Sequence, residues 1–221
     1  MVGLFDSGRG GELAVMELLK LCPNAELEFY ADRENAPYGT KSEGELVELV
    51  KKDIDILRER GALRVLMACC TASTVYRLLP EEYRDIAIPI IAPAAAAAVY
   101  ISSNKKIAVI STAATARSGA FEREIHRYCP AAEVFSAACG GLVSLVEGGV
   151  CDGCVGFSER ENIKRIISPI LGCGADTVIL GCTHFAALEE EIKNITGMNT
   201  VNSARIGAAL LAGLICEGAG T

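Results

Sequence analysis

The chain of 221 residues contains no tryptophan, and aromatic residues make up only 5% of it, although 51% of its residues are apolar. The core therefore has to be built mainly from Ala, Val, Ile and Leu, which is typical of helices packed on a largely parallel sheet. A chain of this length holds one large domain or two small ones, with ample apolar material for a buried core.

Basic residues are in the minority and form no cluster. Lys and Arg total 21, against 28 for Asp and Glu, so the net charge is −7. Proteins that bind nucleic acid or an anionic membrane surface normally carry a basic patch. We therefore expect neither of these partners.

A secretory signal and a membrane-spanning run are also missing. Asp6 stands where a signal peptide would continue its apolar stretch. The longest mainly apolar run, 86–101, is interrupted by Pro89 and Pro93 and is shorter than the ~20 residues of a membrane span. The ten cysteines lack the spacing of a small disulfide framework and are typical of reduced thiols. The expectation is a soluble, cytoplasmic protein.

Short apolar runs alternate with segments of helical periodicity along the chain. This alternation predicts an α/β fold with largely parallel sheets and right-handed crossovers. Ser42 with Glu45, and Ser158 with Glu161, have the spacing of capping boxes at helix starts. The predicted strands are 2–5, 26–31, 63–69, 107–112, 133–137, 177–182 and 200–202, and the main predicted helices are 12–21, 42–61, 70–79, 118–128, 158–171, 184–195 and 206–216.

Two segments resemble each other at an offset of 113 residues. Val65-Leu-Met-Ala-Cys-Cys-Thr71 matches Val178-Ile-Leu-Gly-Cys-Thr183, so each half presents a cysteine after a predicted strand. We therefore expect two α/β units, with the crossing point between Pro89 and Pro93. Residues 1–92 plus 204–221 would form the first domain, and residues 93–203 the second.

Reactive side chains follow three of the predicted strands. Asp6 follows the first, Cys69 ends the third, and Cys182 with His184 ends the sixth. Ligands of open α/β sheets bind outside the carboxyl ends of the strands. A single buried cysteine is often apolar filler, but two cysteines in matching places favour paired thiol chemistry. His184 can tune the Cys182 thiol. For Glu147 two interpretations remain open: an acid of the site, or a solvated acid in a loop.

Two thiols that face one carbon atom from opposite sides can invert it without a cofactor. A thiolate removes a proton from one face while a thiol delivers a proton to the other. The carbanion-like transition state needs hydrogen-bond donors on the substrate carboxylate. Suitable donors are the backbone N–H groups at helix starts and the hydroxyls of Ser7, Thr71, Thr115 and Thr183.

Six sequence motifs together resemble those of a known family. Segments that span most of the chain, in family order, resemble the glutamate racemases of the aspartate/glutamate racemase family. They are Gly3-Leu-Phe-Asp-Ser-Gly-Arg-Gly-Gly11, Tyr30-Ala-Asp-Arg-Glu-Asn-Ala-Pro-Tyr-Gly-Thr-Lys-Ser42, Ala68-Cys-Cys-Thr-Ala-Ser73, Ser111-Thr-Ala-Ala-Thr-Ala-Arg-Ser118, Leu145-Val-Glu147 and Leu180-Gly-Cys-Thr-His184.

The resemblance implies a cofactor-independent enzyme that interconverts L- and D-glutamate and supplies D-glutamate for peptidoglycan. It also implies two pseudo-symmetric Rossmann-like domains, an active site in the cleft between them, and a homodimer. By motif position, Cys69 and Cys182 would be the acid/base thiols, assisted by Asp6 and His184, with Glu147 supporting His184. The substrate pocket would be lined by Ser7, Pro37, Tyr38, Gly39, Cys70, Thr71, Thr115 and Thr183.

Some residues depart from the family pattern. Cys70 stands where the family usually carries Asn, a stronger hydrogen-bond partner. This leaves two alternatives: a racemase of aspartate or another small acidic compound, and an inactive member that acts as a binding protein. A thiol hydrolase built on Cys182, His184 and Glu147 would leave Cys69 without a role. The Cys151 and Cys154 pair has no second such pair, so we expect no metal site.

Overall fold

The computed structural model describes residues 1–218 and contains two four-stranded sheets in that range. The first sheet has the order β2-β1-β3-β4 and the second the order β6-β5-β7-β8, with every neighbouring pair parallel. The two orders correspond strand for strand, and the predicted α/β class is confirmed. The strands are β1 (Val2–Asp6), β2 (Leu27–Ala31), β3 (Arg64–Met67), β4 (Ala87–Pro89), β5 (Lys106–Ser111), β6 (Glu133–Ala138), β7 (Thr177–Gly181) and β8 (Asn199–Asn202).

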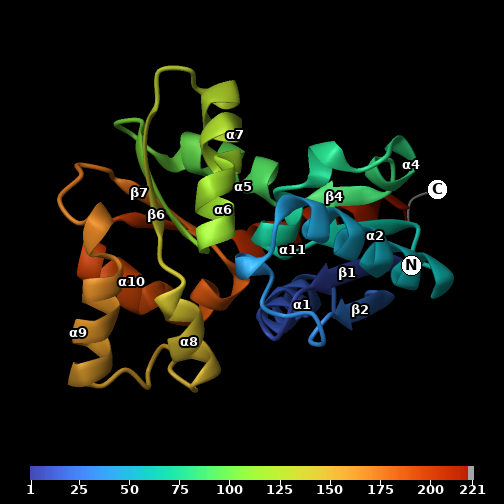
Figure 1. Cartoon of the computed structure of the whole chain (residues 1–221), viewed down its shortest axis with the longest axis horizontal. Helices are drawn as coiled ribbons and strands as arrows, with labels where there is room; N and C mark the ends of the chain where they lie inside the picture. Colours follow the sequence, from blue (N-terminus) through green and yellow to red (C-terminus); the bar gives the residue numbers. More distant parts are fainter. Residues whose placement is uncertain (219–221) are drawn as a thin grey trace.

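Helices flank both sheets. We call the chain from β1 to β4 the first half and the chain from α5 to β8 the second half, and Figure 1 shows them on opposite sides of the molecule. The helices are α1 (Gly10–Leu21), α2 (Glu43–Glu59), α3 (Cys70–Ser73), α4 (Glu81–Arg84), α5 (Ile91–Ile101), α6 (Ala113–Ser118), α7 (Ala120–Tyr128), α8 (Gly141–Glu147), α9 (Phe157–Ile166), α10 (Glu189–Thr196) and α11 (Ser203–Gly218). Short 3₁₀ segments are η1 (Tyr38–Thr40), η2 (Tyr76–Leu78), η3 (Ser168–Ile170) and η4 (Thr183–Leu188).

The last helix, α11, returns from the second half to pack against α1 (Figure 1). Ala204, Ala208 and Leu211 of α11 share a buried cluster with Leu4 and Leu18 of the first half. Residues 219–221 of the predicted first domain lie outside the described part of the chain. Within residues 1–218, none of the helices has the length and apolarity that a membrane crossing requires.

The capping prediction is confirmed for α2 and wrong for α9. Ser42 accepts a hydrogen bond from the Glu45 backbone N–H, and the Glu45 side chain accepts one from the Ser42 N–H. Helix α9 instead begins at Phe157, directly after Gly156 in an extended conformation, so Ser158 already lies inside the helix. The apolar run 86–101 forms β4 and α5. Pro93 fits the first turn of α5 because the N–H groups there have no helical partner.

Candidate active site

Three strands, two in the first sheet and one in the second, bring the predicted reactive residues together at their carboxyl ends. Asp6 is the last residue of β1, Cys69 lies two residues beyond β3, and Cys182 directly follows β7. Strands β3 and β7 hold the same position in their respective sheets. The two thiols are therefore presented by equivalent places of the two halves, as the internal repeat predicts.

The Cys69 thiol is buried at the start of α3. It accepts a hydrogen bond from the Ala72 backbone N–H at 3.5 Å and lies 3.4 Å from the Ser7 hydroxyl. Only 6% of the residue is exposed. Burial, with a further contribution from the negative charge of Asp6, raises the pKa of Cys69 to about 11. The thiol is therefore neutral near pH 7 in this state.

The Cys182 thiol is the first member of a chain of three side chains. Its Sγ atom lies 3.8 Å from Nδ1 of His184, and Nε2 of His184 lies 2.6 Å from Oε1 of Glu147. Burial raises the pKa of Cys182 well above its ordinary value, and the thiols of Cys70 and Cys69 act in the same direction. Glu147 is the last residue of α8, and 43% of its side chain is exposed. The structure thus brings Glu147 to His184 rather than leaving it in a loop.

The Asp6 carboxylate connects the two halves. Its Oδ1 accepts a hydrogen bond from the Gly8 N–H at 2.9 Å, and its Oδ2 accepts one from the Thr183 hydroxyl at 3.0 Å. Complete burial raises the pKa of Asp6, while the charge of His184 acts in the opposite direction. The close approach depends on glycine, because a Cβ added at Gly10 would collide with the Thr183 hydroxyl.

Three threonine hydroxyls form a second contact between the halves. The Oγ1 atoms of Thr71, Thr112 and Thr115 lie 2.9–3.0 Å from one another. Thr71 belongs to α3, whereas Thr112 caps the start of α6. Sequence reasoning quoted Thr112 within a motif but did not assign it to the site, and only the fold shows that it faces Thr71.

The Cys70 thiol has a hydrogen-bond partner within the protein. It donates a hydrogen bond to the Ser203 hydroxyl at 3.4 Å, and that hydroxyl donates to the Leu180 carbonyl oxygen at 2.7 Å. Burial raises the pKa of Cys70. Ser203 is the first residue of α11, and nothing in the local sequence pattern marks it as part of the site.

The predicted pocket residues Pro37, Tyr38 and Gly39 lie in and just before η1. Pro37 is exposed and follows a cis peptide bond, while Tyr38 is buried. The Tyr38 hydroxyl contacts the carboxylates of Asp32 and Asp53, which sequence reasoning missed. Gly39 faces the second half, because an added Cβ there would lie 3.0 Å from Cβ of Thr112. Their substrate contacts stay a prediction.

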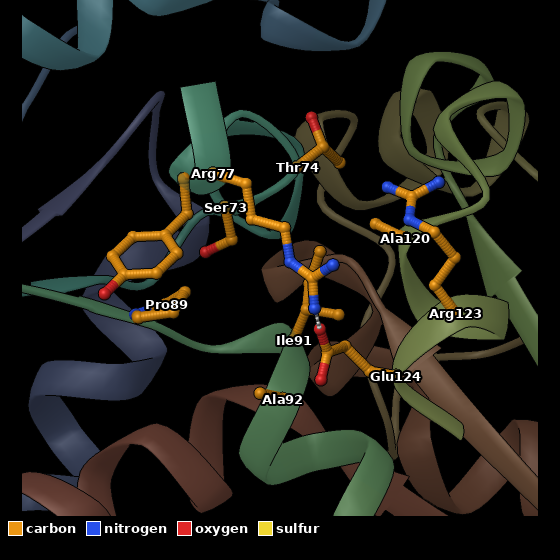
Figure 2. A pocket seen from close by; sticks show the side chains of 10 residues that line it. Ser73, Thr74, Arg77, Pro89, Ile91, Ala92, Ala120, Arg123 and Glu124 are labelled. Carbon is orange, nitrogen blue, oxygen red and sulfur yellow. Dashed lines mark hydrogen bonds and ion pairs between the residues drawn. The ribbon is translucent and has the colours of Figure 1, made fainter. Parts of the chain in front are cut away.

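The two halves also meet at a cavity that lies away from these residues. Figure 2 shows Arg77 of η2 aimed at Glu124 of α7, and the guanidinium donates to the carboxylate at 2.6 Å. The cavity beside them has a volume of about 40 Å³, which is room for a few water molecules and too little for an amino acid. Among residues 1–218, the His, Cys, Asp and Glu side chains form no group of three suited to a metal ion.

Comparison with known proteins identifies the family. The family model "Asp/Glu/Hydantoin racemase" matches residues 20–211. The chain belongs to this family. The glutamate racemase of Herpetosiphon aurantiacus is 35% identical over 198 residues, which cover 90% of this chain and 77% of that protein. The predicted resemblance is thereby confirmed, and the protein is an enzyme of the isomerase class.

Nearly the whole of this chain matches solved racemase structures. The crystal structure of the glutamate racemase isoform RacE1 from Bacillus anthracis matches with a TM-score of 0.90 at 29% identity, covering 99% of this chain and 82% of that one. The Francisella tularensis glutamate racemase in complex with D-glutamate matches with a TM-score of 0.89 at 28% identity, covering 99% of this chain and 81% of that one. The pair of parallel sheets is thus the family fold.

Proposed function

We propose that this racemase is a cofactor-independent glutamate racemase that interconverts L- and D-glutamate through Cys69 and Cys182. One observation carries the proposal. The two thiols follow β3 and β7, which occupy equivalent positions in the two sheets, and each thiol has an ionisable neighbour: His184 lies 3.8 Å from the Cys182 sulfur, and the charge of Asp6 acts on Cys69. A pseudo-symmetric pair of this kind suits a reaction whose substrate and product are mirror images at one carbon atom.

In each turnover one C–H bond and one S–H bond break, and one bond of each kind forms. One cysteine thiolate removes the proton from the α-carbon of glutamate, while the thiol of the other cysteine delivers its proton to the opposite face. The first cysteine ends as a thiol and the second as a thiolate. The enzyme is then poised for the reverse direction, and no proton or electron is gained or lost overall.

The raised pKa values of both thiols determine what the neighbouring groups must do. A thiol with a pKa of about 11 is rarely ionised near pH 7, but its thiolate is a strong base for a weak carbon acid. The Cys182 proton can pass to Nδ1 of His184, because Glu147 stabilises the resulting imidazolium at Nε2. For Cys69 the corresponding acceptor is Asp6, whose buried carboxylate has a raised pKa.

Glutamate is favoured as the substrate by the relatives. Proteins about 35% identical to this chain are named glutamate racemases, and one of the solved structures holds D-glutamate. The threonine hydroxyls at the junction of α3 and α6 are suitable donors for its carboxylates. The Cys70 thiol already donates to Ser203, so it is not a substitute for the family asparagine as a substrate ligand.

The proposal also covers the cellular role, the oligomeric state and the domain division of the enzyme. D-glutamate made in the cytoplasm would supply peptidoglycan synthesis, and the active enzyme would be a homodimer. The two halves would be domains, residues 1–92 plus 204–221 and residues 93–203, with the active site between them. The packing of α11 on α1 supports this division.

The test is proton exchange at the α-carbon. In heavy water the enzyme should replace the α-proton of L-glutamate with deuterium, which proton NMR measures. It should also abolish the optical activity of the solution, which polarimetry measures. Aspartate is tested in parallel. Exchange with aspartate alone would move the substrate assignment to aspartate, and exchange with neither acid would overturn the proposal.

A further inference from the structure

Three buried oxygen-bearing side chains meet beneath η1. The Tyr38 hydroxyl oxygen lies 2.7 Å from Oδ2 of Asp32 and 2.7 Å from Oδ2 of Asp53. Each of the three residues is at most 1% exposed. A phenol carries a single proton and can donate it to only one of the two carboxyl groups. The second short contact therefore requires a second proton, which must come from a carboxylic acid.

The surroundings of the two acids indicate which one carries that proton. Both oxygens of Asp32 accept from the Asn35 side-chain amide at 3.0 Å, which favours a carboxylate. Asp53 Oδ1 has no hydrogen-bond partner in the part of the chain that is described, although it is buried. An ionised carboxylate without partners is costly to bury. Burial, together with the smaller effect of the Asp32 charge, raises the pKa of Asp53 to about 7, although the hydrogen bond with Tyr38 acts in the opposite direction.

Other charged groups around Asp53 do not change this assignment. From its own helix Lys52 favours the ionised form, and from β1 the Asp6 carboxylate favours the neutral form. Tyr30 of β2 is also near the pair of acids, and burial together with their charges raises its pKa. Of these groups only Lys52 opposes the neutral acid, and its effect is weaker than that of Asp32.

The cluster of Tyr38, Asp32 and Asp53 includes the first residue of η1, a segment that contacts the active site. Tyr38 begins η1, and the next residue, Gly39, packs on Thr112 of the second half. Thr112 belongs to the triangle of hydroxyls with Thr71 and Thr115. The position of the Tyr38 side chain therefore fixes how η1 lies against the junction of the two halves.

We propose that Asp53 is a positioning residue that acts as a neutral carboxylic acid. Its O–H donates to the Tyr38 oxygen, the Tyr38 O–H donates to Asp32, and this chain holds η1 against Thr112. The assignment of the proton depends only on the local geometry. Its consequence for glutamate rests on the proposed function.

Loss of the Asp53 proton should weaken substrate binding. With both acids ionised, two negative charges would share one phenol proton, and their repulsion would loosen η1. The KM for glutamate should then rise above a pH of about 7, while kcat changes less because the thiols and their partners are not moved directly. A rise of about tenfold corresponds to the loss of one buried hydrogen bond.

Infrared spectroscopy tests the proton without any substrate. The wild-type protein near pH 6 should show a carboxylic-acid C=O band that weakens as the pH passes about 7. The Asp53→Asn variant should lack this band, whereas Asp55→Asn should keep it, because Asp55 lies on the same helix but is 45% exposed. A spectrum without a band specific to Asp53 at pH 6 would overturn the proposal, whether or not the protein racemises glutamate.

Kinetics then test the positioning role. The amide side chain introduced by Asp53→Asn stays neutral and keeps an N–H donor, so the KM of this variant should match the wild-type value near pH 6 and stay constant to about pH 8.5. Asp53→Ala should raise KM across this range, and Asp55→Asn should follow the wild type. A KM for Asp53→Asn that rises with pH as in the wild type would contradict the proposal. If Asp53→Asn fails to fold, the infrared difference between the wild type and Asp53→Ala decides, because Asp6 is a second buried acid with a raised pKa.

Discussion

Nε2 of His184 lies 2.6 Å from Oε1 of Glu147, although the two residues are 37 positions apart in the chain. Helix α8 ends at Glu147, and η4, which begins directly after Cys182, carries His184. The opposite ring nitrogen of His184 faces the Cys182 sulfur. A carboxylate on one side of an imidazole and a thiol on the other form a path along which a proton can move from sulfur to ring.

Removal of the Glu147 charge should impair this path. We expect Glu147→Gln to lower kcat by about tenfold or more with little change in KM, because the imidazolium of His184 loses its counter-charge. Racemisation kinetics with each enantiomer measure the effect, and Glu122→Gln on the exposed face of α7 is the control. The equilibrium constant of a racemisation is one, so kcat/KM must fall equally in both directions. Unchanged kcat would remove Glu147 from the mechanism.

The pKa of Asp53 predicts how stability depends on pH. Its pKa is about 7 in the folded protein and near 3.8 when unfolded, so the folded state holds the proton more tightly. This contribution is complete below pH 4 and is lost as the pH rises to about 7. It amounts to about 4 kcal/mol at most. Urea unfolding should show this decline in the wild type relative to Asp53→Asn, and parallel curves for the two proteins would contradict it.

The glycine at position 10 should be required for the approach of α1 to the site. An alanine there would collide with Thr183 and crowd His184, so we expect Gly10→Ala to cost about 1–3 kcal/mol of stability and to reduce racemisation. Gly44→Ala is the matched control, because nothing lies within 4 Å of an added Cβ in this helical position. There the change should stabilise slightly. Thermal unfolding of both variants checks the contrast, and equal effects would refute the steric explanation.

Burial of the two site thiols predicts an order of chemical reactivity. Cys69 and Cys182 are 6% and 8% exposed and have raised pKa values, whereas Cys154 is exposed. Since the thiolate is the reactive form, iodoacetamide near pH 8 should modify Cys154 well before either site thiol. Peptide mapping by mass spectrometry follows the three sites. Faster modification of Cys69 or Cys182 than of Cys154 would show that these thiols are open and ionised in solution.

The sequence predicts the frame of the site because the positions of the strands and of their ends follow from periodicity. The alternation of apolar runs, with the repeat around Cys69 and Cys182, leads directly to two parallel sheets with a thiol at equivalent ends. The partners of those thiols depend on long-range packing. No local sequence pattern encodes the contacts of Ser203, Thr112 and Glu147, because the fold alone brings their partners to them.

The buried acid shows a different limit of sequence reasoning. Asp53 lies within the apolar stripe of α2, beside Val50 and Ile54, so its burial follows from helical spacing. The role of Asp53 does not follow from helical spacing, because its hydrogen-bond partner Tyr38 belongs to a separate segment of the chain. The capping pattern at Ser158 also failed, because α9 follows Gly156 and begins at Phe157, two residues before the start that a Ser158 cap implies.

The most direct test of the account compares Cys69→Ser with Cys182→Ser in heavy water. Each variant should lose racemisation of glutamate by at least about a thousandfold, because a serine hydroxyl cannot replace a thiolate base. The remaining thiol should still exchange the α-proton of one enantiomer, and the two variants should act on opposite enantiomers. Near-normal racemisation by either variant would contradict the claim that two sulfur atoms act on opposite faces of one carbon.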